Sequence, residues 1–296
     1  MIDFLATEPH YAEHLRPVYD ALPEDVRGRF ARSPRELRAP GTLTVVASWR
    51  DYQNTRGPVA FFEHGAGFTY NSPNRSYAGA GGRDRVRLFA NVNEHVDALN
   101  RAAYPNARHA IVGAPKLDAL TKLRAPGTRR VAFSWHWDCH VVPETRTAFP
   151  HYTDVLADVP AEWQPIGHAH PRAWGFARPR YEELGWEIAE TFADVVALAD
   201  VYVCDTSSTL YEFAALDRPV IVLNAPWYRR DVEQGLRFWR DIPGVQVNEP
   251  GQLLPLADEV RRIDGWIGRR REAVARVYPH LGNAAPVAAA ALLDAL

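Results

Sequence analysis

The sequence predicts an α/β protein with two Rossmann-like domains that face each other across a cleft. Short apolar runs typical of buried strands alternate with helical segments along most of the 296 residues. This alternation restarts after a Pro-Gly linker at 124–128, and parallel strands joined by helices form sheets covered on both faces. We therefore expect an N-terminal domain at 1–125 and a C-terminal domain at 126–296, with the last helix able to pack back on the first domain.

The first half contains four predicted strands, and the last of them lies ahead of the linker. Residues 1–40 are punctuated by Pro and Arg, and there we expect only a short helix at 25–30. The run 42–48 is rich in β-branched residues and predicts the first strand. The other expected elements are a strand at 58–63, a loop at 69–85, a strand at 86–90, a helix at 94–103 and a strand at 109–112.

The second half shows the same alternation of predicted strands and helices. A strand at 131–134 begins it, and the apolar run 201–204 predicts a buried strand directly before a polar turn. Asp217-Arg218-Pro219 ends the helix that follows, because proline cannot continue a helix. The other expected elements are strands at 164–167 and 220–223 and helices at 145–156, 188–199, 210–216, 232–239, 253–263, 267–277 and 286–296.

Composition excludes several classes of protein. A net charge of −2 and a pI of about 6.6 argue against a nucleic-acid coat and against a polybasic membrane anchor. Cys139 and Cys204 are too few for a disulfide framework. No apolar run approaches the roughly 20 residues that span a bilayer, and the first residues lack the pattern of a signal peptide. We expect a cytoplasmic protein without integral membrane contact.

The polar turn at 205–209 is the most informative feature of the chain. It lies where a helix begins at the carboxyl end of a parallel strand, so free N–H groups and the helix dipole favour a bound anion. Open parallel sheets also bind ligands outside these strand ends. A single residue would suffice for ordinary helix capping, so five polar residues in a row favour a phosphate or diphosphate site. The predicted donor-binding residues here are Asp205, Thr206, Ser207, Ser208 and Thr209.

Histidines follow three other predicted strands. His64 stands in Glu-His-Gly-Ala-Gly, where glycines permit close approach and an imidazole suits general-base chemistry near neutral pH. His136 lies between two tryptophans, and His170 precedes a proline that holds it extended. Each alone is equally compatible with a turn or with packing. Their shared position at strand ends, where the two sheets would face one another, favours a site.

The second half resembles the CDP-glycerol glycerophosphotransferase family of wall teichoic acid synthesis, which has the two-Rossmann-domain fold called GT-B. The likeness covers roughly residues 130–295, and in the first half only His64-Gly65 matches, against the family's Trp-His-Gly. The matching segments are Phe133–Asp138, His170-Pro171, Asp205–Ser208 with Phe213, Asp217-Arg218-Pro219, and Asp231, Gly235, Asp241 and Pro243-Gly244.

The resemblance implies roles at these positions. His64 would be the base that deprotonates an acceptor hydroxyl, with Glu63 beside it and Gly65 and Gly67 on the acceptor side. His170 and the Ser207/Ser208 turn would hold the donor diphosphate, and His136 would assist by its position. Such enzymes need no divalent metal or other cofactor, because dipoles, hydroxyls and histidine offset the charge of the leaving group.

The sequence thus predicts an inverting transferase that moves a glycosyl or glycerophosphoryl group from a nucleotide-diphosphate donor to a hydroxyl. The short first half and the lack of a basic amphipathic helix favour glycosyl transfer, so the acceptor stays open: a soluble glycan, a polymer or a modified nucleic-acid base. The alternatives are a CDP-glycerol glycerophosphotransferase proper, a sugar-nucleotide epimerase, and a nucleotide-binding module without catalytic activity.

Overall fold

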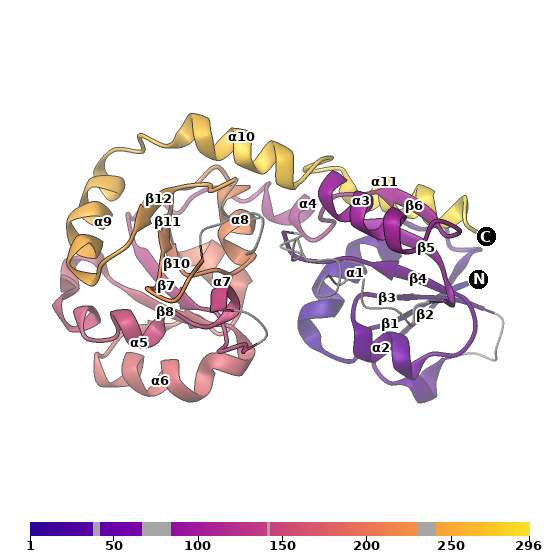
Figure 1. Ribbon diagram of the computed structural model, residues 1–296, viewed down its shortest axis with the longest axis horizontal. Coiled ribbons are helices and arrows are strands. Elements are labelled where there is room, and N and C mark those ends of the chain that lie inside the picture. Colours follow the sequence, from indigo (N-terminus) through magenta and orange to yellow (C-terminus); the bar gives the residue numbers. More distant parts are fainter. Residues whose placement is uncertain (38–41, 67–83, 141–142, 230–240) are drawn as a thin grey trace. The chain divides into compact units, whose positions relative to one another are not determined.

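The computed structural model describes residues 1–37, 42–66, 84–140, 143–229 and 241–296. It divides into two compact units, one made of 1–122 with 275–296 and the other of 123–274. Each unit contains a parallel sheet with helices on both faces (Figure 1), which confirms the predicted α/β class. None of the helices in the described part of the chain has the length and apolar character needed to cross a membrane.

The sheet of the first unit has the strand order β2-β1-β3-β4-β5-β6. Strands β1, β3 and β4 are buried along their whole length, as apolar strands covered on both faces must be. The strands are β1 Ile2–Leu5, β2 Arg27–Ala31, β3 Leu43–Val46, β4 Val59–Phe62, β5 Val86–Asn91 and β6 Arg108–Ile111. The helices are α1 Pro9–Ala21, α2 Trp49–Asn54, α3 Glu94–Ala103, α4 Leu117–Leu120 and α11 Ala284–Leu293.

The sheet of the second unit has the order β12-β11-β10-β7-β8-β9. Its central strands β7, β10 and β11 are fully buried. The strands are β7 Val131–Trp135, β8 Ile166–Ala169, β9 Glu187–Ile188, β10 Val201–Cys204, β11 Val220–Leu223 and β12 Val245–Val247. The helices are α5 Phe149–Tyr152, α6 Trp174–Glu183, α7 Phe192–Leu198, α8 Thr209–Ala214, α9 Leu253–Arg262 and α10 Ile267–Val277, whose last three residues belong to the first unit.

Both strand orders reverse once, and the reversal marks where a ligand is expected. In the second sheet, β7 lies between β8 and β10, so the chain winds outward in both directions from these central strands. In the first sheet, the same reversal lies between β1 and β3. Parallel sheets of this kind bind ligands beyond the carboxyl ends of the strands at the reversal. A ligand is therefore expected beside the residues that follow β7 and β10.

The last helix, α11, is part of the first unit and packs against α1. Asp118 accepts hydrogen bonds from the backbone N–H groups of Ala284 and Ala285 at 3.0 and 2.7 Å, so it satisfies the first turn of α11. Gly113 has a φ of +76° and lies so close to the Pro279 carbonyl that a Cβ would meet that oxygen at 2.1 Å. These contacts join the end of the chain to the unit that contains its beginning.

The first forty residues differ most from the sequence prediction. The helix expected at 25–30 is wrong, because strand β2 occupies Arg27–Ala31 and pairs in parallel with β1. Gly28 fits there since a Cβ would meet the Asp3 carboxylate at 2.2 Å. Strand β1 and helix α1 were not expected. Pro17 lies inside α1, and a proline inside a helical pattern argues against a continuous helix.

The second unit also departs from the predicted elements. The helix expected at 145–156 is broken into α5, flanked by 3-10 turns at Pro143–Thr145 and Val155–Asp158. Of the segment expected as a helix at 188–199, only Phe192–Leu198 is helical, and β9 precedes it. Helices α2, α4 and α6 and strand β12 were missed. The helix expected at 232–239 and nearly all of the loop expected at 69–85 lie outside the described residues.

Candidate functional site

The polar turn follows β10 at the reversal of the second sheet. Thr206 and Ser207 are buried, whereas Ser208 and Thr209 are partly exposed. The backbone N–H of Ser207 donates to the Asp205 carbonyl at 2.8 Å, and the Thr206 hydroxyl donates to the carbonyl of Glu144 at 2.6 Å. The chain thus turns sharply at the strand end and places the Ser207 and Ser208 side chains where α8 begins.

Asp205 braces this turn from inside. Its carboxylate is fully buried and accepts from the backbone N–H groups of His136 and Ala148 at 2.7 and 2.9 Å, and from the Thr147 hydroxyl at 3.2 Å. Burial raises the pKa of Asp205, while His136 and these hydrogen bonds oppose that shift. Asp205 therefore fixes the loops after β7 and before α5, and its oxygens are occupied by protein donors.

Two histidines meet at the carboxyl ends of β7 and β8. The rings of His136 and His170 have centroids 5.6 Å apart, and Trp137 lies 6.2 Å from His170. His136 Nδ1 lies 3.0 Å from the Thr145 carbonyl oxygen, and His170 Nδ1 accepts from the Arg172 N–H at 3.1 Å. The Arg172 guanidinium stands over Trp137 at 5.0 Å. The Arg172 guanidinium supplies positive charge, and the His136 N–H bond to Asp205 joins this loop to the turn, an arrangement that suits an anion.

Sequence reasoning missed Arg172 and gave both tryptophans equal weight. Trp135 is buried in the core, where its ring packs against Phe149 and Tyr152. Trp137, two residues on, is the partly exposed one and lies at the strand edge. Residues two apart in a strand share a face, so spacing alone would not have separated them; β7 ends at Trp135, and Trp137 lies beyond the strand.

An ion pair supports the same loops. Glu144 is fully buried and accepts from the Arg229 backbone N–H at 2.7 Å and from its guanidinium at 2.6 and 2.8 Å. The carbonyl of Glu144 is the acceptor for Thr206. The pair therefore joins the chain after β11 to the polar turn, although nothing in the sequence near Glu144 indicates it.

The first unit contains a cluster of imidazoles around His64, directly after β4. The Tyr11 ring meets His64 edge-on at 5.0 Å, and the His14 ring lies 5.6 Å away. Both neighbours belong to α1, which follows β1 at the reversal of this sheet. His14 was not predicted as part of the site, and the signal for it was the spacing of four from His10, which places both on one helix face.

Electrostatics keeps His64 uncharged. Burial, His10 and Lys116 lower its pKa to about 4, against a smaller opposing effect of a backbone hydrogen bond with Ala47. Burial, Lys116 and the other two histidines also lower the pKa of His14 well below its usual range. His64 Nδ1 is buried without a hydrogen-bond partner among the described residues. A neutral imidazole can accept a proton at pH 7, which is the state a general base requires.

The neighbours of His64 have different surroundings. Glu63 is buried and accepts from the Asn100 amide of α3 at 3.2 Å, whereas His64 contacts α1. Asn100 also donates to Asn91, so Glu63 belongs to a polar network between β5 and α3. Gly65 has a φ of +74°, a conformation that favours glycine. Gly67 lies outside the described residues.

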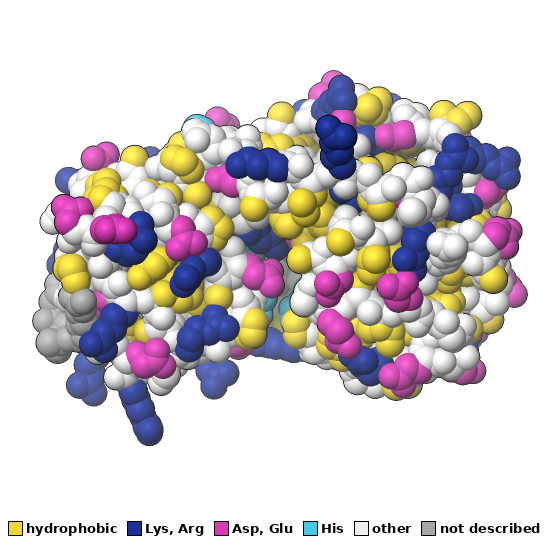
Figure 2. All heavy atoms as spheres, turned by 180° about the vertical axis from the view of Figure 1, so that it is seen from behind, with side chains coloured by type: hydrophobic (Ala, Val, Ile, Leu, Met, Phe, Trp, Pro, Cys, Tyr) yellow, Lys and Arg dark blue, Asp and Glu magenta, His cyan; other side chains and the backbone are white. Residues whose placement is uncertain are grey.

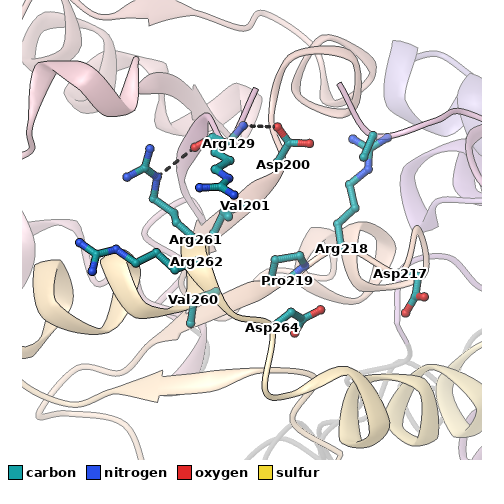
Figure 3. A pocket seen from close by; sticks show the side chains of 11 residues that line it. Arg129, Asp200, Val201, Asp217, Arg218, Pro219, Val260, Arg261, Arg262 and Asp264 are labelled. Carbon is teal, nitrogen blue, oxygen red and sulfur yellow. Dashed lines mark hydrogen bonds between the residues drawn. The ribbon is translucent and has the colours of Figure 1, made fainter. Parts of the chain in front are cut away.

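A separate hollow of about 240 Å³ lies at the other end of the second sheet (Figure 3). It is lined by residues at the amino ends of β10 and β11, including Val201 and Pro219, with arginines and aspartates around them. Asp200 accepts there from the Arg129 N–H at 2.6 Å, and Arg261 donates to the Arg129 carbonyl at 3.0 Å. This hollow is thus distinct from the residues at the carboxyl ends.

Surface charge is mixed on one face of the molecule. Figure 2 shows basic and acidic side chains interspersed over the face that it draws. Within the ranges that the structure describes, no three His, Cys, Asp or Glu side chains are grouped to hold a metal ion.

The chain has a GT-B-like fold with two parallel sheets, and histidines and a hydroxyl turn follow the carboxyl ends of their strands. Residues 186–281 match the family model of CDP-Glycerol:Poly(glycerophosphate) glycerophosphotransferase, which confirms the resemblance inferred from the motifs. No curated protein sequence matches the chain.

Solved structures share the fold. The wall teichoic acid polymerase TagF matches with 14% identity and a TM-score of 0.63, covering 100% of this chain and 88% of that chain. A UDP-GlcNAc 2-epimerase from Neisseria meningitidis matches with 12% identity and a TM-score of 0.57, covering 99% of both chains. An Anabaena protein in complex with UDP-glucose matches with 12% identity and a TM-score of 0.54, covering 100% and 99%.

Proposed function

We propose that the protein transfers a glycosyl or glycerophosphoryl group from a nucleotide-diphosphate donor to an acceptor hydroxyl. The observation that carries this proposal is the convergence of the Ser207 turn, His136 and His170 at the strand reversal of the second sheet. N–H and O–H donors at neighbouring strand ends suit the charge that develops on a phosphate leaving group. The family match over 186–281 includes this turn and supports the same proposal.

In this proposal, the second unit binds the donor and the first unit supplies the base. His64 accepts the proton of the acceptor hydroxyl, whose oxygen attacks the transferred group. His170, with the hydroxyls of Ser207 and Ser208, offsets the charge of the departing phosphate. The His136 ring lies beside that of His170 and assists it in binding the donor. Asp205 and Thr206 fix the conformation of the turn through their hydrogen bonds. No divalent metal is needed in this scheme, and the reaction belongs in the cytoplasm, where nucleotide donors are available.

The released nucleotide distinguishes the two kinds of transfer. Glycosyl transfer breaks the bond between the sugar carbon and the diphosphate, so a nucleoside diphosphate leaves. Glycerophosphoryl transfer breaks a bond within the diphosphate, so a nucleoside monophosphate leaves and glycerol phosphate goes to the acceptor. The family match favours the second, whereas Glu-His-Gly-Ala-Gly in place of Trp-His-Gly favours an acceptor other than teichoic acid.

The first experiment is a thermal-shift panel with CDP, UDP, GDP, ADP, CDP-glycerol and common UDP- and GDP-sugars. A ligand present at 100 times its Kd stabilises the folded protein by about 2.7 kcal/mol, which is a readable shift. The stabilising donor is then incubated with hydroxylated acceptors, and the nucleotide product is identified by chromatography. Absence of any shift and of any nucleotide release would refute the proposed function.

A further inference from the structure

A chain of hydrogen-bonded side chains lies under the polar turn of the second unit. Ser207 Oγ accepts from the Thr209 hydroxyl at 2.8 Å and from the Thr209 N–H at 3.3 Å. Thr209 Oγ1 also lies 2.9 Å from the Tyr202 hydroxyl. A threonine hydroxyl has one proton, and Thr209 gives it to Ser207. Tyr202 must therefore be the donor in its bond with Thr209.

The inner end of this chain is buried and fixed. Tyr202 is fully buried, and burial raises the pKa of its phenol well above the ordinary value, so the proton stays on the oxygen. Ser134 lies opposite Cys204 on the neighbouring strand β7, and its Oγ lies 2.7 Å from His168 Nδ1. Ser134 and His168 are both buried. The donors thus run outward from Tyr202 through Thr209 to Ser207.

This direction decides what Ser207 can bind. Its oxygen already accepts two hydrogen bonds, which fill its two lone pairs. Its own proton has no acceptor among the residues that the structure describes, and the residue keeps a small exposed fraction of 9%. Ser207 can therefore only donate to a ligand, which suits a phosphate oxygen and not an N–H group.

We propose that Tyr202 is a positioning residue for the donor phosphate, acting through Thr209 to keep Ser207 as a hydrogen-bond donor. The proposal rests on the proposed function of the turn and adds a residue that neither the motifs nor the family match singled out. Packing alone would not require the phenol oxygen. The Tyr202 ring lies against Phe192 and Phe213, with centroids 6.1 and 5.0 Å away, and a phenylalanine would fill the same space.

The test compares Tyr202→Phe with Tyr181→Phe. Tyr181 is a matched control, because it is equally buried in the same unit and its hydroxyl bonds to the carbonyls of Phe133 and His168. Inorganic pyrophosphate and the nucleotide that stabilises the wild type are titrated by calorimetry. We expect Tyr202→Phe to weaken both by roughly threefold to tenfold, with the matching nucleoside unaffected. Tyr181→Phe should lower thermal stability and leave both affinities unchanged.

Substitutions at Thr209 give an independent test. Thr209→Val keeps the shape and removes the hydroxyl, so pyrophosphate binding should weaken at least as much as in Tyr202→Phe. Thr209→Ser keeps the hydroxyl and should restore wild-type affinity. Equal pyrophosphate affinity in the wild type, Tyr202→Phe and Thr209→Val would overturn the positioning role while leaving the proposed function intact. A wild type that binds neither pyrophosphate nor any nucleotide would overturn both.

Discussion

The Asp205 carboxylate accepts a hydrogen bond from the backbone N–H of His136 at 2.7 Å, and the two residues follow adjacent strands. This bond ties the polar turn to the loop that carries His136 and Trp137. The second carboxylate oxygen holds Thr147 and Ala148 in the same way. The shape of the candidate donor site thus depends on one buried carboxylate that is occupied by protein.

Replacing Asp205 by Ala should therefore destabilise the protein and disrupt the turn. Three buried donors lose their acceptor, so we expect the free energy of unfolding to fall by about 2–4 kcal/mol. Urea denaturation measures the loss. Asp138→Asn is the control, since Asp138 is partly exposed and pairs with His140 and Arg146 near the surface, where such pairs contribute under about 1 kcal/mol. Equal stability of the two variants would contradict the bracing role.

His64→Gln should abolish most transfer without weakening donor binding. A general base typically contributes about 10²–10⁴-fold to the rate, so kcat should fall by that factor while the Kd of the donor stays constant. The control is His109→Gln in the same unit, because His109 hydrogen-bonds to the Tyr104 carbonyl and stacks on Phe89. If His109→Gln loses as much activity as His64→Gln, the base assignment is wrong.

The pH dependence of kcat/KM should report the low pKa of His64. The base is active when unprotonated, so the acid limb is expected at about pH 4 and not near 6.5. Removing a nearby cation makes protonation easier, so Lys116→Met should move the limb to higher pH. Lys122→Met removes an equal charge at an exposed position and should leave it in place. An unchanged limb in Lys116→Met would remove Lys116 from this explanation.

Stability should also fall as the pH is lowered from about 6.5 to about 4. In this window the unfolded chain protonates His14 and His64, whereas the folded protein keeps both neutral, so protons favour unfolding. We expect a loss of roughly 3 kcal/mol from His64 and a further loss from His14, measured by denaturation at several pH values. The loss should be smaller in a His14→Gln, His64→Gln double variant, and parallel curves for variant and wild type would contradict the expectation.

The ion pair between Glu144 and Arg229 should respond unequally to its two substitutions. Arg229→Met leaves a fully buried carboxylate with fewer donors, a change that costs about 3–5 kcal/mol when the charge has no other compensation. Glu144→Gln removes the buried charge itself and leaves an arginine whose side chain is 41% exposed, so it should cost less. Thermal unfolding of both variants measures the difference, and the reverse order would refute this account.

Part of the candidate site could be predicted from residue spacing and composition. Hydroxyl residues after an apolar run indicated the turn at 205–209. The strand period of two would place His168 and His170 on one face, and they differ because β8 ends at Ala169, before His170. His168 bonds to buried Ser134, whereas His170 meets His136 and Trp137 at the edge. The same reasoning failed at 25–30, because pairing with β1 made a strand from residues that local pattern assigned to a helix.

The sequence by itself determined the α/β class, most of the core strands and the motif that the family shares, because these depend on local periodicity and order along the chain. The tertiary structure alone decided which polar groups are hydrogen-bonded within the protein and which can still bond to a ligand. Asp205 and Ser207 are two residues apart, yet Asp205 is filled by donors from His136, Thr147 and Ala148, while Ser207 keeps its proton. That difference depends on hydrogen-bond partners, some of them distant in sequence, which local spacing does not encode.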